Sequence, residues 1–252
     1  MSERFEGRTL FVTGAGSGIG RATALQAGVE GGRVACADID EKTLGETVEL
    51  IREAGGAALA VVCNVMDAAS VRDAMACAVA EFDGLQVLCN VAGTGGLEHT
   101  EKVSEADWNR IIGVNLSGTF FVSQAALPHL LENRRSAISN VASVAGLNGQ
   151  AYSAAYCASK FGVVGLTKAL AVEYSQKGLR VNCVCPGAVR TPMIGRSLQP
   201  EGADLDLLKR LALVNAFTRP EEVADALLYL ASGQARSING VALPMDFGNS
   251  AS

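Results

Sequence analysis

Short apolar segments alternate with helix-length amphipathic segments along almost the whole chain, and this alternation is what most limits its fold. The apolar segments are mostly continuous, as strands are when both faces of a sheet are buried. They lie at 8–13, 33–38, 58–64, 85–90, 136–143, 180–185 and 241–244, and helical segments between them include 41–55, 70–82 and 219–232. The pattern predicts an α/β fold, a doubly wound parallel sheet of about seven strands with helices on both faces.

The chain has 252 residues, without an internal repeat, a low-complexity linker or a break in composition. It therefore predicts a single domain over residues 1–252. The segment 188–215 is the least regular part, and we expect it to form a lid over a site.

Charge and cysteine usage exclude several classes of protein. Lys and Arg number 21 against 26 Asp and Glu, a net charge of −5, and no basic run exceeds two residues, which argues against nucleic-acid binding.

The 7 cysteines are odd in number and form no C-x-x-C pair, so we expect buried free thiols in a reducing compartment. The N-terminus is charged, and no stretch approaches the ~20 apolar residues that span a bilayer, which predicts a cytoplasmic protein without a membrane partner. His99 and His129 lie far apart without ligand-like neighbours, so no metal site is expected.

A glycine-rich turn, TGAGSGIG at 13–20, lies between the first predicted strand and a helix that begins near Ile19. Its glycines allow positive φ and close backbone approach. The helix N-terminus then offers free N–H groups and a positive dipole to a pyrophosphate. The alternative is a tight strand–helix turn without a ligand.

Asp38 ends the second predicted strand, about twenty residues after the turn, where a dinucleotide site places an acid on the adenosine ribose. A carboxylate there repels a 2′-phosphate, and neither the turn nor the neighbours of Asp38 supply an Arg or Lys. This favours NAD over NADP. A solvated strand end is the alternative interpretation.

The stretch YSAAYCASKFG places Tyr152, Tyr156 and Lys160 at intervals of four residues. In a helix each such step advances about 400°, so the three side chains would share one face. Two phenols and an ammonium on one face leave three interpretations open: a catalytic site, a protein interface or a chance arrangement.

With these features the chain resembles, over nearly its whole length, the compact single-domain members of the short-chain dehydrogenase/reductase family. Thr13–Gly20 is similar to the family's TG-x-x-x-G-x-G turn, and Cys89–Gly93 is similar to its N-N-A-G segment. Asn115, Ser143, Tyr156 and Lys160 match its catalytic tetrad. The resemblance implies a Rossmann-like sheet and these cofactor-binding residues: Gly14, Ser17, Gly18, Ile19, Gly20, Asp38, Ile39, Asn64, Val65, Asn90, Ala92, Gly93, Tyr156, Lys160, Pro186, Gly187, Val189 and Thr191.

Three positions depart from the family pattern. Val91 replaces the second Asn of N-N-A-G, and Asn64 stands where the family usually has Asp. Asn can still accept and donate a hydrogen bond, so we expect adenine binding to survive. The segment MDFG near the C-terminus replaces a more usual D-G-G.

The tetrad predicts a proton-transfer mechanism. A free tyrosine, with a pKa near 10, is poorly matched to neutral pH. We expect Lys160 and the positive charge of an oxidised nicotinamide to stabilise the phenolate of Tyr156 and together to lower its pKa by roughly 2–3 units. Ser143 would orient the substrate oxygen, and the resemblance implies that Lys160 holds the nicotinamide ribose and that Asn115 holds a water.

The sequence thus predicts an NAD-dependent oxidoreductase that interconverts a secondary alcohol and a ketone, on a hydrophobic or cyclic substrate. The alternatives are an NADP-dependent 3-oxoacyl carrier-protein reductase and a non-catalytic dinucleotide-binding sensor. The resemblance also implies a homotetramer, and it places substrate contacts at Thr94, Ala145, Gln150, Tyr152 and Met193.

Overall fold

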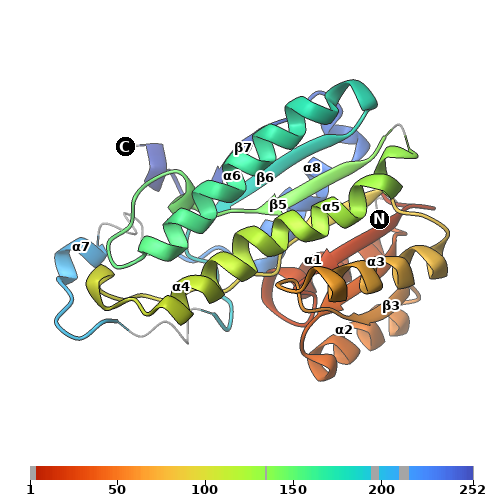
Figure 1. The fold of residues 1–252 in the computed structure, drawn as a ribbon. Helices are drawn as coiled ribbons and strands as arrows, with labels where there is room; N and C mark the ends of the chain where they lie inside the picture. The colour runs from red at the N-terminus through yellow and green to blue at the C-terminus, as the bar shows by residue number, and fades with distance from the viewer. Residues whose placement is uncertain (1–3, 134, 194–198, 210–215, 252) are drawn as a thin grey trace.

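The computed structural model describes residues 4–133, 135–193, 199–209 and 216–251. These residues form a parallel sheet of seven strands in the order β3-β2-β1-β4-β5-β6-β7, with helices on both faces (Figure 1). The predicted α/β fold with a doubly wound parallel sheet is therefore confirmed.

The strands follow the apolar segments to within about two residues, the usual uncertainty of element ends. They are β1 Thr9–Thr13, β2 Arg33–Asp38, β3 Ala57–Val62, β4 Val87–Asn90, β5 Ala137–Val141, β6 Arg180–Pro186 and β7 Ala242–Met245. The α-helices of the described part are α1 Gly18–Val29, α2 Glu41–Glu53, α3 Ala68–Phe82, α4 Glu105–Ile112, α5 Gly118–Leu131, α6 Ala154–Tyr174, α7 Leu205–Lys209 and α8 Pro220–Ala231.

The core has one layer on each face of the sheet. Helices α1, α2 and α8 cover one face and enclose buried residues such as Leu10, Leu44 and Leu228. Helices α3, α5 and α6 cover the other face, around Phe11, Leu88 and Ile138. Because both faces are covered, the strands need continuous apolar sequences, which explains the pattern seen along the chain.

The two halves of the sheet diverge between β1 and β4, which are hydrogen-bonded neighbours. The chain runs outward from β1 to β3 on one side, and from β4 to β7 on the other. In open α/β sheets, ligands bind in the crevice at such a switch point, outside the carboxyl ends of the strands. The segments 91–104 and 142–153 follow the carboxyl ends of β4 and β5 at this edge, and residues 187–193 follow that of β6.

Helices α4 and α5 form one helical run, Glu105–Leu131, through a π-helical turn at Gly113–Ser117. By length and composition alone this run is long and apolar enough to cross a membrane. Here α5 packs on α3 and on the sheet, and the π-helical turn contacts α6. Length and apolarity are properties that core helices share with spanning ones.

The cysteines only partly match the expectation. All are free, and five are buried, but Cys77 is exposed and Cys157 is half-buried. Cys77 lies on the outer side of α3, where the apolar neighbours in the sequence did not reveal its exposure.

Candidate functional site

The glycine turn packs directly against the loop that follows β4. Gly14 has a φ of 69°, and a β-carbon there would lie 2.9 Å from both Cα and N of Ala92. Thr13 Oγ1 accepts hydrogen bonds from the backbone N–H groups of Val91 (2.9 Å) and Ala92 (3.1 Å). The turn and the 91–96 segment are thereby fixed to each other at the switch point.

Helix α1 begins inside this turn, at Gly18, whose φ is 52°. Among the described contacts, the side chain of its N-cap, Ser17, makes no capping bond. The first N–H groups of a helix have no intrahelical partner and carry its positive dipole, so they can receive an anion. Thr191 closes the turn from the other half of the chain, with its Cγ2 3.2 Å from where a β-carbon of Gly18 would lie. This cradle fits the pyrophosphate of a dinucleotide.

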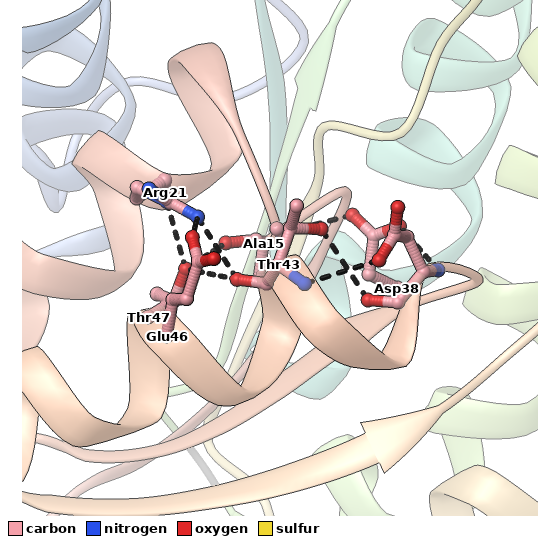
Figure 2. A network of polar contacts seen from close by, with 8 residues as sticks. Ala15, Arg21, Asp38, Thr43, Glu46 and Thr47 are labelled. Atoms are coloured by element: carbon pink, nitrogen blue, oxygen red, sulfur yellow. Dashed lines mark hydrogen bonds and ion pairs between the residues drawn. The ribbon is translucent and has the colours of Figure 1, made fainter.

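Asp38 lies at the end of β2 beside the same turn (Figure 2). Its Oδ2 accepts from the N–H of Gly16 at 2.8 Å, and its Oδ1 accepts from the N–H of Asp40 at 3.1 Å. A β-carbon on Gly16 would lie 2.9 Å from Asp38 Oδ2 and 2.6 Å from Thr43 Oγ1. The carboxylate is therefore held at the turn by backbone donors, where an adenosine ribose would lie.

Arg21 of α1 extends from the turn toward α2. Its guanidinium donates to Thr43 O (2.9 Å) and Thr47 Oγ1 (2.9 Å) and pairs with Glu46 at 3.0 Å (Figure 2). Thr47 Oγ1 in turn donates to Ala15 O at 2.9 Å. Arg21 therefore ties α2 to the turn, and its charge is paired with that of Glu46.

Several of the predicted adenine-side residues lie close together beside the glycine turn. They are Val65, Asn90 and Ala92, which are grouped with Thr13, Val114 and Thr119. Asn64 Oδ1 accepts from the N–H of Met66 at 3.1 Å and so closes its own turn before α3. Ile39 is 67% exposed beyond Asp38, as an outer wall of a cofactor site can be.

Asn90 directs its side chain into the interior. Its Nδ2 donates to Ser123 Oγ (3.0 Å) and Asn140 Oδ1 (2.9 Å), and Asn140 Nδ2 donates to Thr167 Oγ1 (2.9 Å). Asn90 Oδ1 is buried and has no hydrogen-bond partner among the described atoms. The amide of Asn90 thus links β4 to β5 and α5, and Asn140 continues the link to α6.

Asn115 lies in the π-helical turn and holds the 91–104 loop. Its Oδ1 accepts from the N–H of Thr94 at 2.8 Å, and its Nδ2 donates to Thr94 O (2.9 Å) and Ser159 Oγ (3.0 Å). Ser159 Oγ donates to Tyr156 O at 2.7 Å. One buried amide therefore joins the loop after β4 to the helix that carries Tyr156.

Tyr156 and Lys160 lie one turn apart on α6, with Lys160 Nζ 5.7 Å from the centre of the Tyr156 ring. The ammonium donates to Val141 O at 2.8 Å, at the end of β5. A β-carbon on Gly93 would lie 3.4 Å from Asn115 Oδ1 and 3.7 Å from Lys160 Nζ. Three of the four predicted catalytic residues, with Gly93, thus meet at one place.

Burial moves the pKa values of these two residues in opposite directions. It lowers the pKa of Lys160 from 10.5 to about 8. It raises the pKa of Tyr156, and the hydrogen bond with Ser143 only partly opposes this rise. In the chain without a cofactor, loss of solvent around the phenol therefore outweighs the hydrogen bond with Ser143. The predicted lowering of the pKa also involves an oxidised nicotinamide, so it stays a prediction. Nζ is directed to Val141 O rather than to the phenol oxygen.

Ser143 joins the ends of β5 and β6. Its hydroxyl accepts a hydrogen bond from the N–H of Ala145 at 3.1 Å and donates one to Pro186 O at 3.4 Å. The same hydroxyl forms the hydrogen bond with Tyr156 described above. Gly187 is held against the last strand by donation from its N–H to Met245 O at 3.0 Å. Val189 forms a parallel bridge with Thr218, which closes the base of the predicted lid.

The predicted substrate residues do not all face one place. Thr94 lies beside Gly95, where a β-carbon would be 3.7 Å from Met193 Sδ and 3.8 Å from the Tyr156 ring. Ala145 is fully buried, and Gln150 accepts a weak contact from the Cys157 thiol. Parts of the predicted lid, 194–198 and 210–215, lie outside the described residues.

Tyr152 departs from the prediction. Helix α6 begins at Ala154, so Tyr152 precedes it and does not share its face with Tyr156 and Lys160. It has a left-handed backbone, φ 62°, which no residue pattern indicated. Its hydroxyl accepts from the N–H of Asp204 at 2.8 Å.

Sequence reasoning also missed Arg110 on α4. Its guanidinium donates to Thr94 Oγ1 at 2.7 Å and pairs with Asp107 at 3.0 Å. Nothing in the sequence singles it out, because the contact depends on how the 91–104 loop folds back on α4. As to metals, residues 4–133, 135–193, 199–209 and 216–251 contain no cluster of three or more His, Cys, Asp or Glu side chains.

A doubly wound sheet with a glycine turn at its switch point, an acid after β2 and a buried Tyr–Lys pair defines an oxidoreductase fold that binds a nicotinamide dinucleotide. The family model described as "short chain dehydrogenase" matches residues 8–202. The chain belongs to the short-chain dehydrogenase family, as its sequence motifs implied.

Relatives with names that describe activities are similar over nearly the full length. A D-threitol dehydrogenase of Mycolicibacterium smegmatis is 39% identical and covers 97% of this chain and 94% of its own. A cyclohexanol dehydrogenase of an Acinetobacter species is 38% identical, with 95% and 94% covered. A crystal structure of a short chain dehydrogenase from Mycobacterium paratuberculosis bound to NAD is 28% identical, with a TM-score of 0.93 over 99% of this chain and 100% of that one.

The lowered pKa of Lys160 predicts a pH dependence of stability. Above about pH 8, native Lys160 releases a proton that the unfolded chain keeps up to about pH 10.5, so stability gains with rising pH. A Lys160→Met variant lacks this gain. We expect the unfolding free energy of the wild type, relative to that of Lys160→Met, to increase by about 1–2 kcal/mol from about pH 7.5 to about pH 9.5.

Urea unfolding at matched protein concentration at both pH values measures this difference. Lys168→Met is the control, since Lys168 is an exposed lysine on the same helix. If the difference in unfolding free energy between the wild type and Lys160→Met is the same at both pH values, burial does not lower the pKa of Lys160.

Proposed function

We propose that the protein is an NAD-dependent oxidoreductase that interconverts a secondary alcohol and a ketone, with Tyr156 as the general acid and base. The observation that carries this proposal is the meeting of Tyr156, Ser143 and Lys160 beside the glycine turn and the Gly93–Gly95 segment. Membership of the short-chain dehydrogenase family supports it.

Each residue has a separate part in the reaction. When bound, the nicotinamide exchanges a hydride with the carbinol carbon. Ser143 orients the substrate oxygen by a hydrogen bond. Tyr156 donates its phenol proton to that oxygen in reduction and takes the proton back in oxidation. Lys160, an ammonium below about pH 8, holds positive charge within 5.7 Å of the Tyr156 ring and would hold the ribose hydroxyls.

Asn115 acts through position. Its side chain is committed to Thr94 and Ser159, so it sets the distance between the 91–104 loop and α6. Its backbone carbonyl accepts from Thr119 Oγ1 at 2.7 Å. The family resemblance implies that Asn115 also holds a water, which would connect Lys160 to solvent.

The walls around Tyr156 support one class of substrate. Gly95 and Met193 leave an apolar surface beside the phenol ring. This supports a hydrophobic or cyclic secondary alcohol, and the similarity to a cyclohexanol dehydrogenase agrees with it. The chain is also similar to a D-threitol dehydrogenase, so a polyol is the alternative substrate class. A panel of cyclohexanol, linear secondary alcohols and C4 polyols with NAD at alkaline pH distinguishes these classes.

Replacing Tyr156 by Phe removes the transferable proton and keeps the ring. We expect kcat on the best alcohol of the panel to fall by about 10³-fold, with NAD affinity changed by less than about threefold. Tyr174→Phe, at the end of the same helix, is the matched control and should keep full activity. Full activity of Tyr156→Phe would refute the mechanism. If the wild type binds NAD tightly yet turns over nothing in a broad alcohol and ketone screen, a dinucleotide-binding sensor becomes the better interpretation.

The position of Asp38 supports NAD as the cofactor. Its carboxylate is fixed by two backbone donors where a 2′-phosphate would lie, and Arg21 is paired with Glu46. We expect NAD to bind at least about tenfold more tightly than NADP, since close like charges are repulsive. Asp38→Ser should narrow this ratio, whereas Asp73→Ser, at an exposed acid on α3, should not. Tighter binding of NADP would favour the 3-oxoacyl carrier-protein reductase alternative.

The exposed apolar side chains support a homotetramer. Trp108, Phe120 and Phe161 are 42%, 41% and 47% exposed on α4, α5 and α6. Faces of this kind are usually covered by a partner, and we propose a second copy of the chain, in the cytoplasm. Light scattering should give a tetrameric mass that Phe120→Glu with Phe161→Glu reduces; a monomeric wild type would refute it.

A further inference from the structure

The loops that leave β4, β5 and β6 meet around the side chain of Tyr152. Its hydroxyl accepts from the N–H of Asp204, in the loop after β6. Its carbonyl accepts from the N–H of Glu98, in the loop after β4, at 2.9 Å. Tyr152 itself belongs to the loop after β5. One residue therefore bonds to both neighbouring loops.

His99 makes a second link between the same loops. Its ring meets the Tyr152 ring edge-on, with centroids 5.0 Å apart and planes at 72°. Its Nε2 donates to Glu201 O at 3.1 Å, so it reaches the same 199–204 segment that Tyr152 holds. Tyr152 and His99 together form what we call the rim clasp.

The backbone of Tyr152 is an independent sign of a specific role. A φ of 62° is uncommon for a residue with a side chain and is energetically unfavourable. Glycine adopts this conformation without that cost. The backbone conformation at this position therefore favours glycine over tyrosine. Unlike glycine, the tyrosine forms a hydrogen bond with Asp204 and a ring contact with His99.

The clasp lies at the mouth of the proposed site. Glu98 and His99 follow Thr94 and Gly95, of which Thr94 is bonded to Asn115 and Gly95 faces the Tyr156 ring. The loop after β6 is closed at its base by the Val189–Thr218 bridge. Between this base and the clasp, Met193 approaches Gly95. Figure 1 shows α7, which follows Asp204, on the same side of the molecule as the start of α6.

We propose that Tyr152 is a positioning residue: with His99 it clasps the 199–204 segment to the rim of the site and so limits the exchange of substrate and product. It does not take part in proton transfer. The effect on the exchange of substrate and product rests on the proposed function. The attachment of the 199–204 segment to the rim does not.

Hydrogen–deuterium exchange of the protein without ligands tests the mechanical part. Tyr152→Phe removes the bond to Asp204 and keeps the ring against His99. We expect peptides within 199–209 to exchange about fivefold faster, the equilibrium weight of one hydrogen bond. His99→Phe, which keeps a ring and loses the bond to Glu201, should have a similar effect. Tyr229→Phe, at a tyrosine on α8 that is 39% exposed, is the matched control. Unchanged exchange in 199–209 for Tyr152→Phe overturns the proposal.

Steady-state kinetics with NAD and cyclohexanol, or the best alcohol of the panel, test the second part. For Tyr152→Phe we expect KM to rise about fivefold, with kcat not decreased and NAD affinity unchanged. A fall in kcat at constant KM would show a role in the chemistry and overturn the positioning role. If the wild type has no turnover, the proposed function fails while the exchange experiment still decides whether the clasp exists.

Discussion

The close approach of the glycine turn to the loop after β4 is the constraint on which the rest of the site depends. Gly14 lies so near Ala92 that a β-carbon does not fit, and Thr13 Oγ1 receives the N–H groups of Val91 and Ala92. This contact fixes where Gly93 and Thr94 leave the sheet. Asn115 then holds Thr94, and Ser159 carries the connection to Tyr156. The position of the Tyr156 phenol is thus set by a series of short contacts that starts at the glycine turn.

The interior of this series is polar, which is costly unless each group is bonded. Asn90, Asn140 and Thr167 form one buried chain, and Asn115 and Ser159 form another. Each amide links elements that lie far apart in the sequence, so these bonds fix the separation of strands and helices at the edge where the site lies. Van der Waals packing alone fixes such separations less specifically, since apolar side chains can slide.

Much of the fold was predictable because burial on both faces gives each strand a continuous apolar sequence. The segments at 33–38 and 180–185 show this, as β2 and most of β6 coincide with them. The place of the glycine turn after β1 and the one-turn separation of Tyr156 and Lys160 could be predicted, because spacing along the chain carries this geometry. Their roles came from the family resemblance. What could not be predicted depends on contacts between loops. Arg110 on Thr94, and His99 with Tyr152, are pairs whose members are separated by 16 residues or more. For Tyr152, the assumption of a continuous helix also failed, because α6 begins only at Ala154.

The opposite pKa directions of Tyr156 and Lys160 have a single cause, the loss of water around both groups. Below about pH 8 the pair therefore carries both of its protons, a neutral phenol beside an ammonium. That state is ready to donate a proton, as ketone reduction requires. Under the proposed mechanism, alcohol oxidation requires the phenolate, which burial disfavours. The ammonium of Lys160 lies 5.7 Å from the centre of the phenol ring, with its Nζ bonded to Val141 O. In this mechanism, a bound oxidised nicotinamide would supply a further positive charge near Tyr156, and this charge would favour the phenolate that alcohol oxidation needs. The protonation of Tyr156 would then depend on the charge of the bound cofactor as well as on the residues around the phenol.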